Sequence, residues 1–176
     1  MLATSDEGKW HIERADGFLD LNMIDQARRE LEQVNPFERR YDNYIYAALR
    51  LALADARWGN AAQFARTLIS RSHTREPDLY VRLAYAVRRA EGIEAARIIL
   101  LQVLKRFPKI AVIPFNLACY ACRLGHPDEA MAYLKKAFKL DPGLREDALD
   151  DEDLQPIRER LEDRPARPPS AKPSRL

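Results

Sequence analysis

Two cysteines three residues apart are the side chains most suggestive of chemistry. Cys119 and Cys122 form a C-x-x-C motif, which occurs in redox proteins and in zinc sites. A redox motif of this kind stands after a strand at the start of a helix, whereas these cysteines lie inside a stretch with helical apolar spacing. A structural zinc ion requires four ligands, and the chain has no second cysteine pair. We therefore expect the cysteines to pack as reduced thiols, without a metal.

The remaining candidates for catalysis are scattered. His11, His73 and His126 lie far apart in the sequence and do not have the ligand spacing of an H-E-x-x-H motif. No phosphate-binding loop, dinucleotide-binding motif or nucleophile elbow is present in the sequence. The adjacent carboxylates of Asp150 and Asp151 are explained by solvation of a helix surface. We therefore predict no catalytic site, no cofactor and no metal, and a protein that is not an enzyme.

Composition narrows the class of partner. Hydrophobic residues make up 47% of the chain and charged residues 32%, and 29 basic against 27 acidic residues leave a net charge of +2. This near-balance argues against a dedicated nucleic-acid binder, which usually carries a clear basic excess. The N-terminus does not resemble a signal peptide, and apolar stretches such as residues 97–102 are too short to span a bilayer. We expect a cytoplasmic protein with no membrane or nucleic-acid partner.

The elements that position these side chains are helices. Apolar residues recur at spacings of three and four over long stretches, and strand-like alternation with hairpin turns is absent from the sequence. Two such stripes are Leu83, Ala84, Val87 and Ala90, and then Ala96, Ile99, Leu100, Val103 and Leu104. The pattern predicts an all-α chain.

The helical pattern repeats along the chain. Residues of the same type recur 34 positions apart, as in the pairs Ala27–Ala61, Leu83–Leu117, Ala84–Ala118, Ala96–Ala130, Leu100–Leu134 and Pro108–Pro142. Between Ala61 and Ala96 the offset is 35, which indicates one inserted residue. Four helix-turn-helix units follow from this period, at about residues 8–40, 41–76, 77–110 and 111–144.

This period and its small residues resemble the tetratricopeptide repeat. The last unit matches the pattern best, at Leu117, Ala118, Gly125, Ala130, Ala137, Asp141 and Pro142. Departures occur in the other units: Gly92 falls one place late, Ala56 replaces the turn glycine, and the first unit is shortened at Pro36. Residues 116–120 followed by 144–154 are also similar to the terminal repeat of bacterial groups of this family.

The resemblance implies a fold. We expect a right-handed α-solenoid of about four helix-turn-helix units plus one C-terminal capping helix from Leu144 to Arg160. Its acidic outer side would comprise Asp147, Asp150, Asp151 and Asp153, because a terminal repeat needs a polar cap. The solenoid with its cap forms one domain over residues 1–162. Residues 163–176, rich in proline and arginine, are predicted to be disordered.

The resemblance also implies a binding surface, since tetratricopeptide proteins generally bind extended peptides on the concave face lined by the first helix of each unit. The residues at the corresponding positions are Asn43, Tyr46, Arg50, Val81, Tyr85, Arg88, Arg89, Phe115 and Arg123, together with Ile12, Asp16 and Cys119. Aromatic side chains interleaved with arginines suit a peptide with acidic and apolar side chains. We therefore predict a protein or peptide partner of this chemistry.

One subfamily of binders is disfavoured. Chaperone-binding members hold a terminal carboxylate with a set of lysine, asparagine and arginine residues. Asn116 occupies one of these positions, but Val81 and Tyr85 occupy two others, and no fifth unit supplies the rest.

Three functions are compatible with these features of the sequence. A protein-interaction module is favoured, and a small secretion-type chaperone for one client is the alternative. The third is RNA binding by the related pentatricopeptide repeat, whose period is similar. The alanine and proline pattern and the small net charge disfavour RNA binding.

Overall fold

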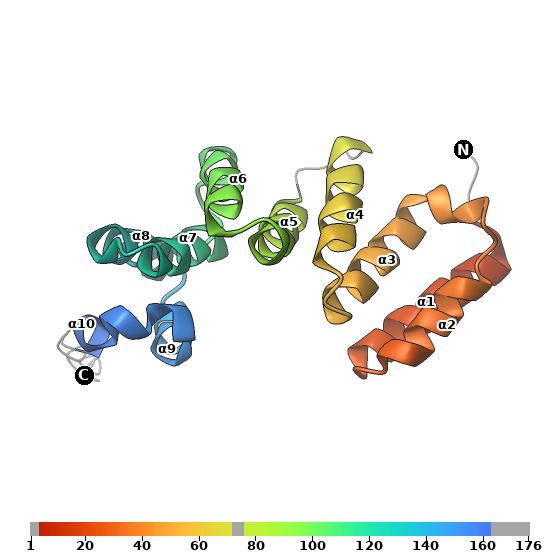
Figure 1. Ribbon diagram of the computed structural model, residues 1–176, viewed down its shortest axis with the longest axis horizontal. Coiled ribbons are helices and arrows are strands. Elements are labelled where there is room, and N and C mark those ends of the chain that lie inside the picture. The colour runs from red at the N-terminus through yellow and green to blue at the C-terminus, as the bar shows by residue number, and fades with distance from the viewer. Residues whose placement is uncertain (1–3, 72–75, 163–176) are drawn as a thin grey trace, which may run out of the picture. The chain divides into compact units, whose positions relative to one another are not determined.

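The computed structural model describes residues 4–71 and 76–162, and no strand occurs in these ranges (Figure 1). The predicted disordered tail at 163–176 and His73 lie outside the described residues. The helical segments, in chain order, are α1 (Asp6–Asp20), α2 (Ile24–Gln33), η1 (Glu38–Arg40), α3 (Asp42–Ala54), α4 (Trp58–Arg71), α5 (Pro77–Ala90), α6 (Ile93–Arg106), α7 (Val112–Arg123), α8 (Pro127–Leu140), α9 (Leu144–Asp150), η2 (Glu152–Ile157) and α10 (Arg158–Glu162).

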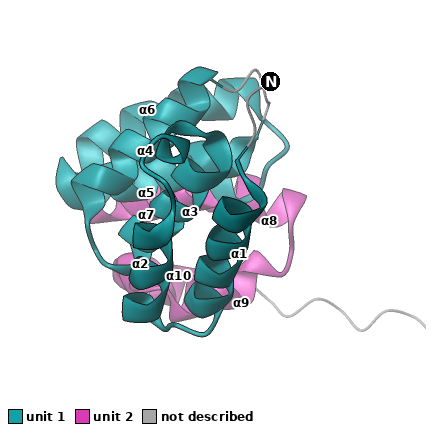
Figure 2. Cartoon of the chain, turned by 90° about the vertical axis from the view of Figure 1, so that its right-hand side faces the viewer, with its two compact units in different colours: residues 1–113 teal, residues 114–176 magenta. Residues whose placement is uncertain are grey.

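Four helix-turn-helix pairs account for most of the chain, as the sequence predicts. The pairs are α1–α2, α3–α4, α5–α6 and α7–α8; the last three lie inside their predicted units, and α1 begins two residues before the first unit. The chain forms two compact units, Met1–Ile113 and Pro114–Leu176 (Figure 2). The first contains three helix pairs, and the second contains most of α7 with α8 and the segments after it. The expected domain over residues 1–162 spans both units and stays a prediction.

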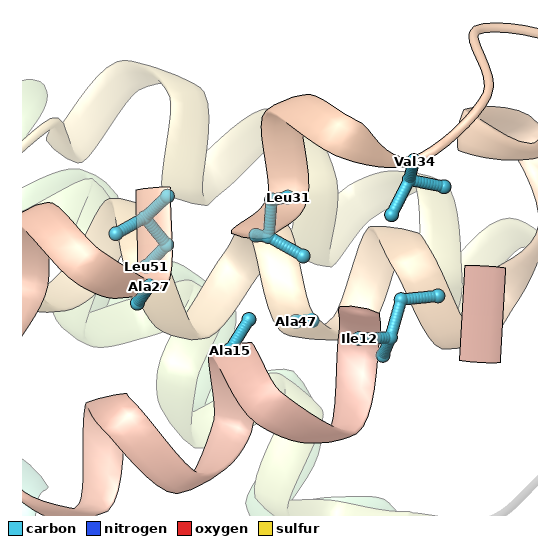
Figure 3. Close-up of a cluster of buried hydrophobic side chains, with 7 residues drawn as sticks. All are labelled: Ile12, Ala15, Ala27, Leu31, Val34, Ala47 and Leu51. Carbon is cyan, nitrogen blue, oxygen red and sulfur yellow. The ribbon is translucent and has the colours of Figure 1, made fainter. Parts of the chain in front are cut away.

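A buried apolar cluster joins the first helix pair to α3. Ile12 and Ala15 of α1, Ala27 and Leu31 of α2, and Val34, Ala47 and Leu51 form its centre (Figure 3). Three of these seven side chains are alanines, which let helix backbones approach closely while the larger residues fill the space beside them. One helix pair alone does not bury its apolar face, because residues of α3, the first helix of the next pair, complete the cluster formed by α1 and α2.

The small residues that define the repeat are buried. Ala84, Ala96, Ala118 and Ala130 all have 1% or less of their surface exposed. The large residues predicted beside them, such as Leu100 and Leu134, are fully buried. The predicted register of the third and fourth units is therefore confirmed.

Three of the four turns inside the pairs share one backbone geometry. Asn22, Ala56 and Gly125 all have positive φ angles, of 57°, 53° and 79°. In each turn the amide of this residue donates to a carbonyl three residues earlier, and the next amide donates to one five residues earlier. This is the Schellman ending of a helix, which favours glycine because a side chain is strained at positive φ. The second unit therefore keeps the turn in spite of Ala56.

The segment expected to form one capping helix, from Leu144 to Arg160, is instead three short helical segments. The α-helix α9 ends at Asp150, and Asp151 is extended, with its side chain accepting a hydrogen bond from the backbone N of Asp153 at 2.8 Å. Pro156 then lies within the 3-10 segment η2. Proline has no amide hydrogen and disfavours an α-helical residue before it, which explains why the helix does not continue.

Candidate functional site

Within residues 1–113, the predicted binding residues lie on α1, α3 and α5, and those of α3 and α5 include the aromatic and basic ones. Tyr46 is half-buried, Tyr85 has 46% of its surface exposed, and Arg89 is exposed. Val81 and Arg88 are also half-buried. Aromatic and cationic side chains are thus accessible on two neighbouring first helices of this unit.

These side chains belong to an arginine–aromatic cluster, which we define as Tyr46, Trp58, Arg82, Tyr85 and Arg89. The rings of Trp58 and Tyr85 meet edge to face with centroids 5.5 Å apart, and the guanidinium of Arg89 lies 5.0 Å from the Trp58 ring centroid. Arg82 lies 6.0 Å from the ring of Tyr46. Each contact is within the range of favourable aromatic and cation–π interactions, so the cluster holds its own side chains in place.

Trp58 and Arg82 were missed by the sequence prediction. Trp58 is the first residue of α4, and the prediction considered the first helix of each pair alone. Arg82 was not among the residues predicted to bind a peptide, although it lies on the α5 stripe with Tyr85 and Arg89 at helical spacing. The helical spacing was the signal that could have identified Arg82. Trp58 depends on a contact between two units of the repeat, which the sequence did not indicate.

Arg50 has an internal role. Its guanidinium donates to Asp16 at 2.7 Å and also to Asp20, both from α1. Burial lowers the pKa of Arg50, but the hydrogen bonds and attraction to Asp20 and Asp16 outweigh it and raise the pKa above its usual value. Two carboxylates therefore already compensate this cation, which weakens it as an anchor for an acidic partner.

Asn43 also contacts its own chain. The hydroxyl of Thr4 donates to Asn43 Oδ1 at 2.9 Å, which ties the start of the chain to α3. The structure therefore gives Asn43 a role within its own chain, which is separate from the predicted contact with a partner.

A hollow of about 310 Å³ lies between α1 and α3. It is lined by Lys9, Ile12, Glu13, Asp16, Asn43 and Tyr46, and we call it the acidic hollow. Four of its residues were expected at binding positions of the first two repeats, namely Ile12, Asp16, Asn43 and Tyr46. The structure brings them together with Glu13, which the sequence prediction did not include.

The predicted binding residues of α7 belong to the second compact unit, residues 114–176, and they are buried or paired within the chain. Phe115 is buried, and Arg123 is exposed with its Nε 3.7 Å from Asp153 Oδ1. Cys119, at a matching position, has 2% of its surface exposed, and its thiol donates to Asp151 Oδ2 at 3.4 Å. The segment after α9 therefore contacts this face of α7. Asp151 and Asp153, expected on the acidic outer side of the cap, turn toward α7 instead.

A group of possible metal ligands results from this packing. Cys119, Asp151 and Asp153 each place one ligand-type atom within 4.8 Å of the others. The sequence did not indicate this group, because its C-x-x-C pattern links Cys119 to Cys122. Groups of the same chain already contact these side chains: Asp151 accepts two hydrogen bonds, and Asp153 pairs with Arg123. Their packing contacts are a sufficient explanation for the arrangement.

The thiol of Cys122 is unsuited to nucleophilic chemistry. Burial raises its pKa, and the charges of Asp153 and Asp151 raise it further, while Arg123 lowers it. A raised pKa keeps the thiol protonated near neutral pH, whereas reactive cysteines have lowered values. His11 is likewise engaged, since its Nδ1 lies 2.7 Å from Glu30 Oε2.

Comparisons with known proteins support the predicted tetratricopeptide-repeat fold. Residues 115–144 match the family model of the tetratricopeptide repeat. TTC0263, a thermophilic tetratricopeptide-repeat protein of Thermus thermophilus, has a similar structure, with 20% sequence identity and a TM-score of 0.64 over 88% of this chain and 82% of that chain. MamA is similar at 14% identity and a TM-score of 0.65, over 84% of this chain and 88% of its own.

A third similar structure is YrrB, described as a tetratricopeptide-repeat protein with an unusual peptide-binding site. It shares 16% identity and has a TM-score of 0.61, over 88% of this chain and 77% of its own. No protein with a curated description matches the chain in sequence.

The described residues have the α-solenoid fold of tetratricopeptide-repeat proteins, as the sequence predicts, and residues 115–144 match the repeat itself. In the described ranges, the helices are all too short or too polar to cross a lipid bilayer.

Proposed function

We propose that the chain is a non-enzymatic cytoplasmic interaction module that binds a partner protein through the arginine–aromatic cluster. The observation that supports this most directly is the accessibility of Tyr85 and Arg89 beside Trp58. Tyrosine, tryptophan and arginine are the residues that most often dominate the energy of protein interfaces. The contacts among the three hold the side chains in place, which lowers the entropy lost when a partner binds.

The chemistry of the cluster favours an acidic and apolar segment of the partner. Arg89 offers a guanidinium for charge-assisted hydrogen bonds with a carboxylate, and Tyr85 offers an exposed ring for apolar contact. Arg82 contributes less to this attraction, because its Nε is 2.6 Å from Asp78 Oδ2. The positively charged end of the binding face is therefore centred on Arg89.

The test begins with affinity capture of a partner by the full chain from cytosol of the source organism. The recovered partner is purified, and its Kd is measured by calorimetry with the wild type and with Tyr85→Ala plus Arg89→Ala. Loss of two interface anchors is expected to raise the Kd by about thirtyfold or more, equivalent to about 2 kcal/mol. Circular dichroism of both proteins checks that the fold is retained.

A matched control replaces one exposed apolar and one exposed basic residue elsewhere in the same repeat. Ile98→Ala plus Lys105→Ala on α6 meets this requirement, and its Kd should remain within about threefold of the wild type. Equal affinities of the two double variants for the partner would contradict the proposal. Recovery of one secreted client, bound to a dimer of this chain, would favour the secretion-type chaperone over a general adaptor.

A further inference from the structure

The acidic hollow between α1 and α3 has the features of a subsite for one side chain. Its volume of about 310 Å³ is at the lower end of the range of ligand pockets, about 300–1,000 Å³. Tyr46 supplies a half-buried aromatic ring and Glu13 and Asp16 supply carboxylates, while the buried Ile12 lies at the base of the hollow. This combination suits a long side chain with an apolar stem and a cationic end.

Negative charge dominates this region. The charged side chains that line the hollow or form ion pairs at its edge are the acidic Asp6, Glu13, Asp16 and Asp20 and the basic Lys9 and Arg50. Lys9 is 3.4 Å from Asp6, and Arg50 pairs with Asp16 and Asp20. Glu13 is exposed and takes part in none of the hydrogen bonds or ion pairs found among the described residues, so its carboxylate is available to a ligand.

Two contacts within the chain show that Asp16 and Tyr46 accommodate guanidinium groups, and they leave Glu13 as the carboxylate available to a ligand. Asp16 accepts a hydrogen bond from Arg50 at 2.7 Å, and the ring of Tyr46 has the guanidinium of Arg82 6.0 Å from its centroid. Arginine pairs with carboxylates through two parallel hydrogen bonds and stacks on aromatic rings, which an ammonium group does less well. The residues of the hollow therefore favour arginine over lysine.

We propose that the acidic hollow binds an arginine side chain of the partner, an inference that rests on the proposed function. The arginine stem packs on the ring of Tyr46, and its guanidinium pairs with Glu13. The partner segment is then bipolar, with an arginine at the α1–α3 hollow and acidic and apolar residues at the cluster on α5. This extends the acidic and apolar partner predicted from the sequence, because the α1 carboxylates would repel a uniformly acidic segment.

The hollow can be tested without the partner, by NMR titration of the full chain with N-acetyl-arginine methylamide. The signals followed are the Tyr46 ring and the Asn43 side-chain amide, with N-acetyl-lysine and N-acetyl-glutamate methylamides as comparison probes. We expect shifts with the arginine probe, weaker shifts with the lysine probe and none with the glutamate probe. Equal shifts with the arginine and glutamate probes would overturn the proposal.

Two charge variants give opposite expectations. Glu13→Gln should weaken binding of the arginine probe about fivefold, and Lys9→Gln should strengthen it, because it removes a repelling cation. Glu94→Gln, an exposed carboxylate on α6, is the matched control and should leave binding unchanged. An affinity that does not change in Glu13→Gln, or that falls equally in Glu94→Gln, would also overturn the proposal.

The outcome is separable from that of the proposed function. If Tyr85→Ala plus Arg89→Ala weakens partner binding but the arginine probe does not bind, the hollow proposal is wrong and the proposed function stands. If the arginine probe binds as expected but the α5 variant binds the partner normally, the arginine subsite stands and the proposed role of the cluster is wrong.

Discussion

Helices α5 and α7 occupy equivalent places in consecutive repeats, yet their equivalent side chains are used differently. Tyr85 and Arg89 correspond to Cys119 and Arg123, 34 residues later. On α5, Tyr85 is exposed and Arg89 lies over Trp58. On α7, Cys119 is buried against Asp151, and Arg123 pairs with Asp153.

Residues at the same position of two repeats can therefore differ in exposure and in the groups that they contact. The α7 positions are covered because the chain continues past the last helix pair and turns two carboxylates toward that helix. Asp151 and Asp153 contact Cys119 and Arg123 from within the chain. The corresponding residues of α5, Tyr85 and Arg89, are exposed and remain candidates for contact with a partner.

The largest expected effect concerns the segment that covers α7. Leu154 in η2 is fully buried, so Leu154→Ala should lower the free energy of unfolding by about 2–5 kcal/mol through lost burial and a residual cavity. Urea unfolding followed by circular dichroism measures this, with the exposed neighbour Gln155→Ala as control. If both variants matched the wild type, Leu154 would not anchor the covering segment.

The equivalence of the two repeats can itself be broken. Ala96 and Ala130 are fully buried 34 residues apart, so Ala96→Leu and Ala130→Leu should each cost about 1–3 kcal/mol by overpacking. Thermal unfolding of each variant is compared with that of the exposed control Lys135→Leu. Melting temperatures of the alanine variants equal to that of the control would contradict the register on which the comparison of α5 with α7 depends.

A smaller effect is expected from the ion pair on α7. Arg123 is exposed and 3.7 Å from Asp153, so Arg123→Ala should cost less than about 1 kcal/mol of stability. It should also leave the Kd for the recovered partner unchanged, unlike Tyr85→Ala plus Arg89→Ala. A loss of partner binding in Arg123→Ala as large as in the α5 variant would mean that the covered face takes part in binding.

The smallest effect is a dependence on pH that is confined to α7. Because the pKa of Cys122 is raised in the folded state, its contribution to stability is present below the ordinary thiol value of about 8.5 and is lost as the pH rises through the folded-state value. The unfolding free energy of the wild type should therefore fall more steeply above that pH than that of Cys122→Ala. Parallel pH profiles of the two proteins would show that the thiol does not titrate differently on folding.

Features that depend on nearby residues were predictable from the sequence. The helix pairs follow from apolar spacing, and their register follows from the recurrence of small residues every 34 positions, because stacked units bury the same positions. Even the degenerate second unit keeps its turn, with Ala56 at a positive φ angle where the last unit has Gly125. The predicted single capping helix was wrong, since the extended Asp151 and Pro156 interrupt it locally.

The surroundings of the candidate-site residues were not predictable in this way. The repeat pattern placed Arg50, Tyr85 and Arg123 at equivalent kinds of position, but it did not distinguish their surroundings. Asp16 reaches Arg50 across 34 residues, and Trp58 reaches Tyr85 across 27. Such contacts depend on the distances between helices and on side-chain direction, which apolar periodicity does not specify.

The sequence by itself determined the all-α class, the four helix pairs and the buried alanines, because these depend on local spacing and on a period that recurs along the chain. The tertiary structure alone decided which equivalent positions are exposed. It places the carboxylates of α1 against Arg50 and those of the C-terminal segment against α7, and it leaves Glu13, Tyr85 and Arg89 accessible. The physical reason is that charge pairing and burial depend on the through-space neighbours of a side chain, whatever its position in the repeat.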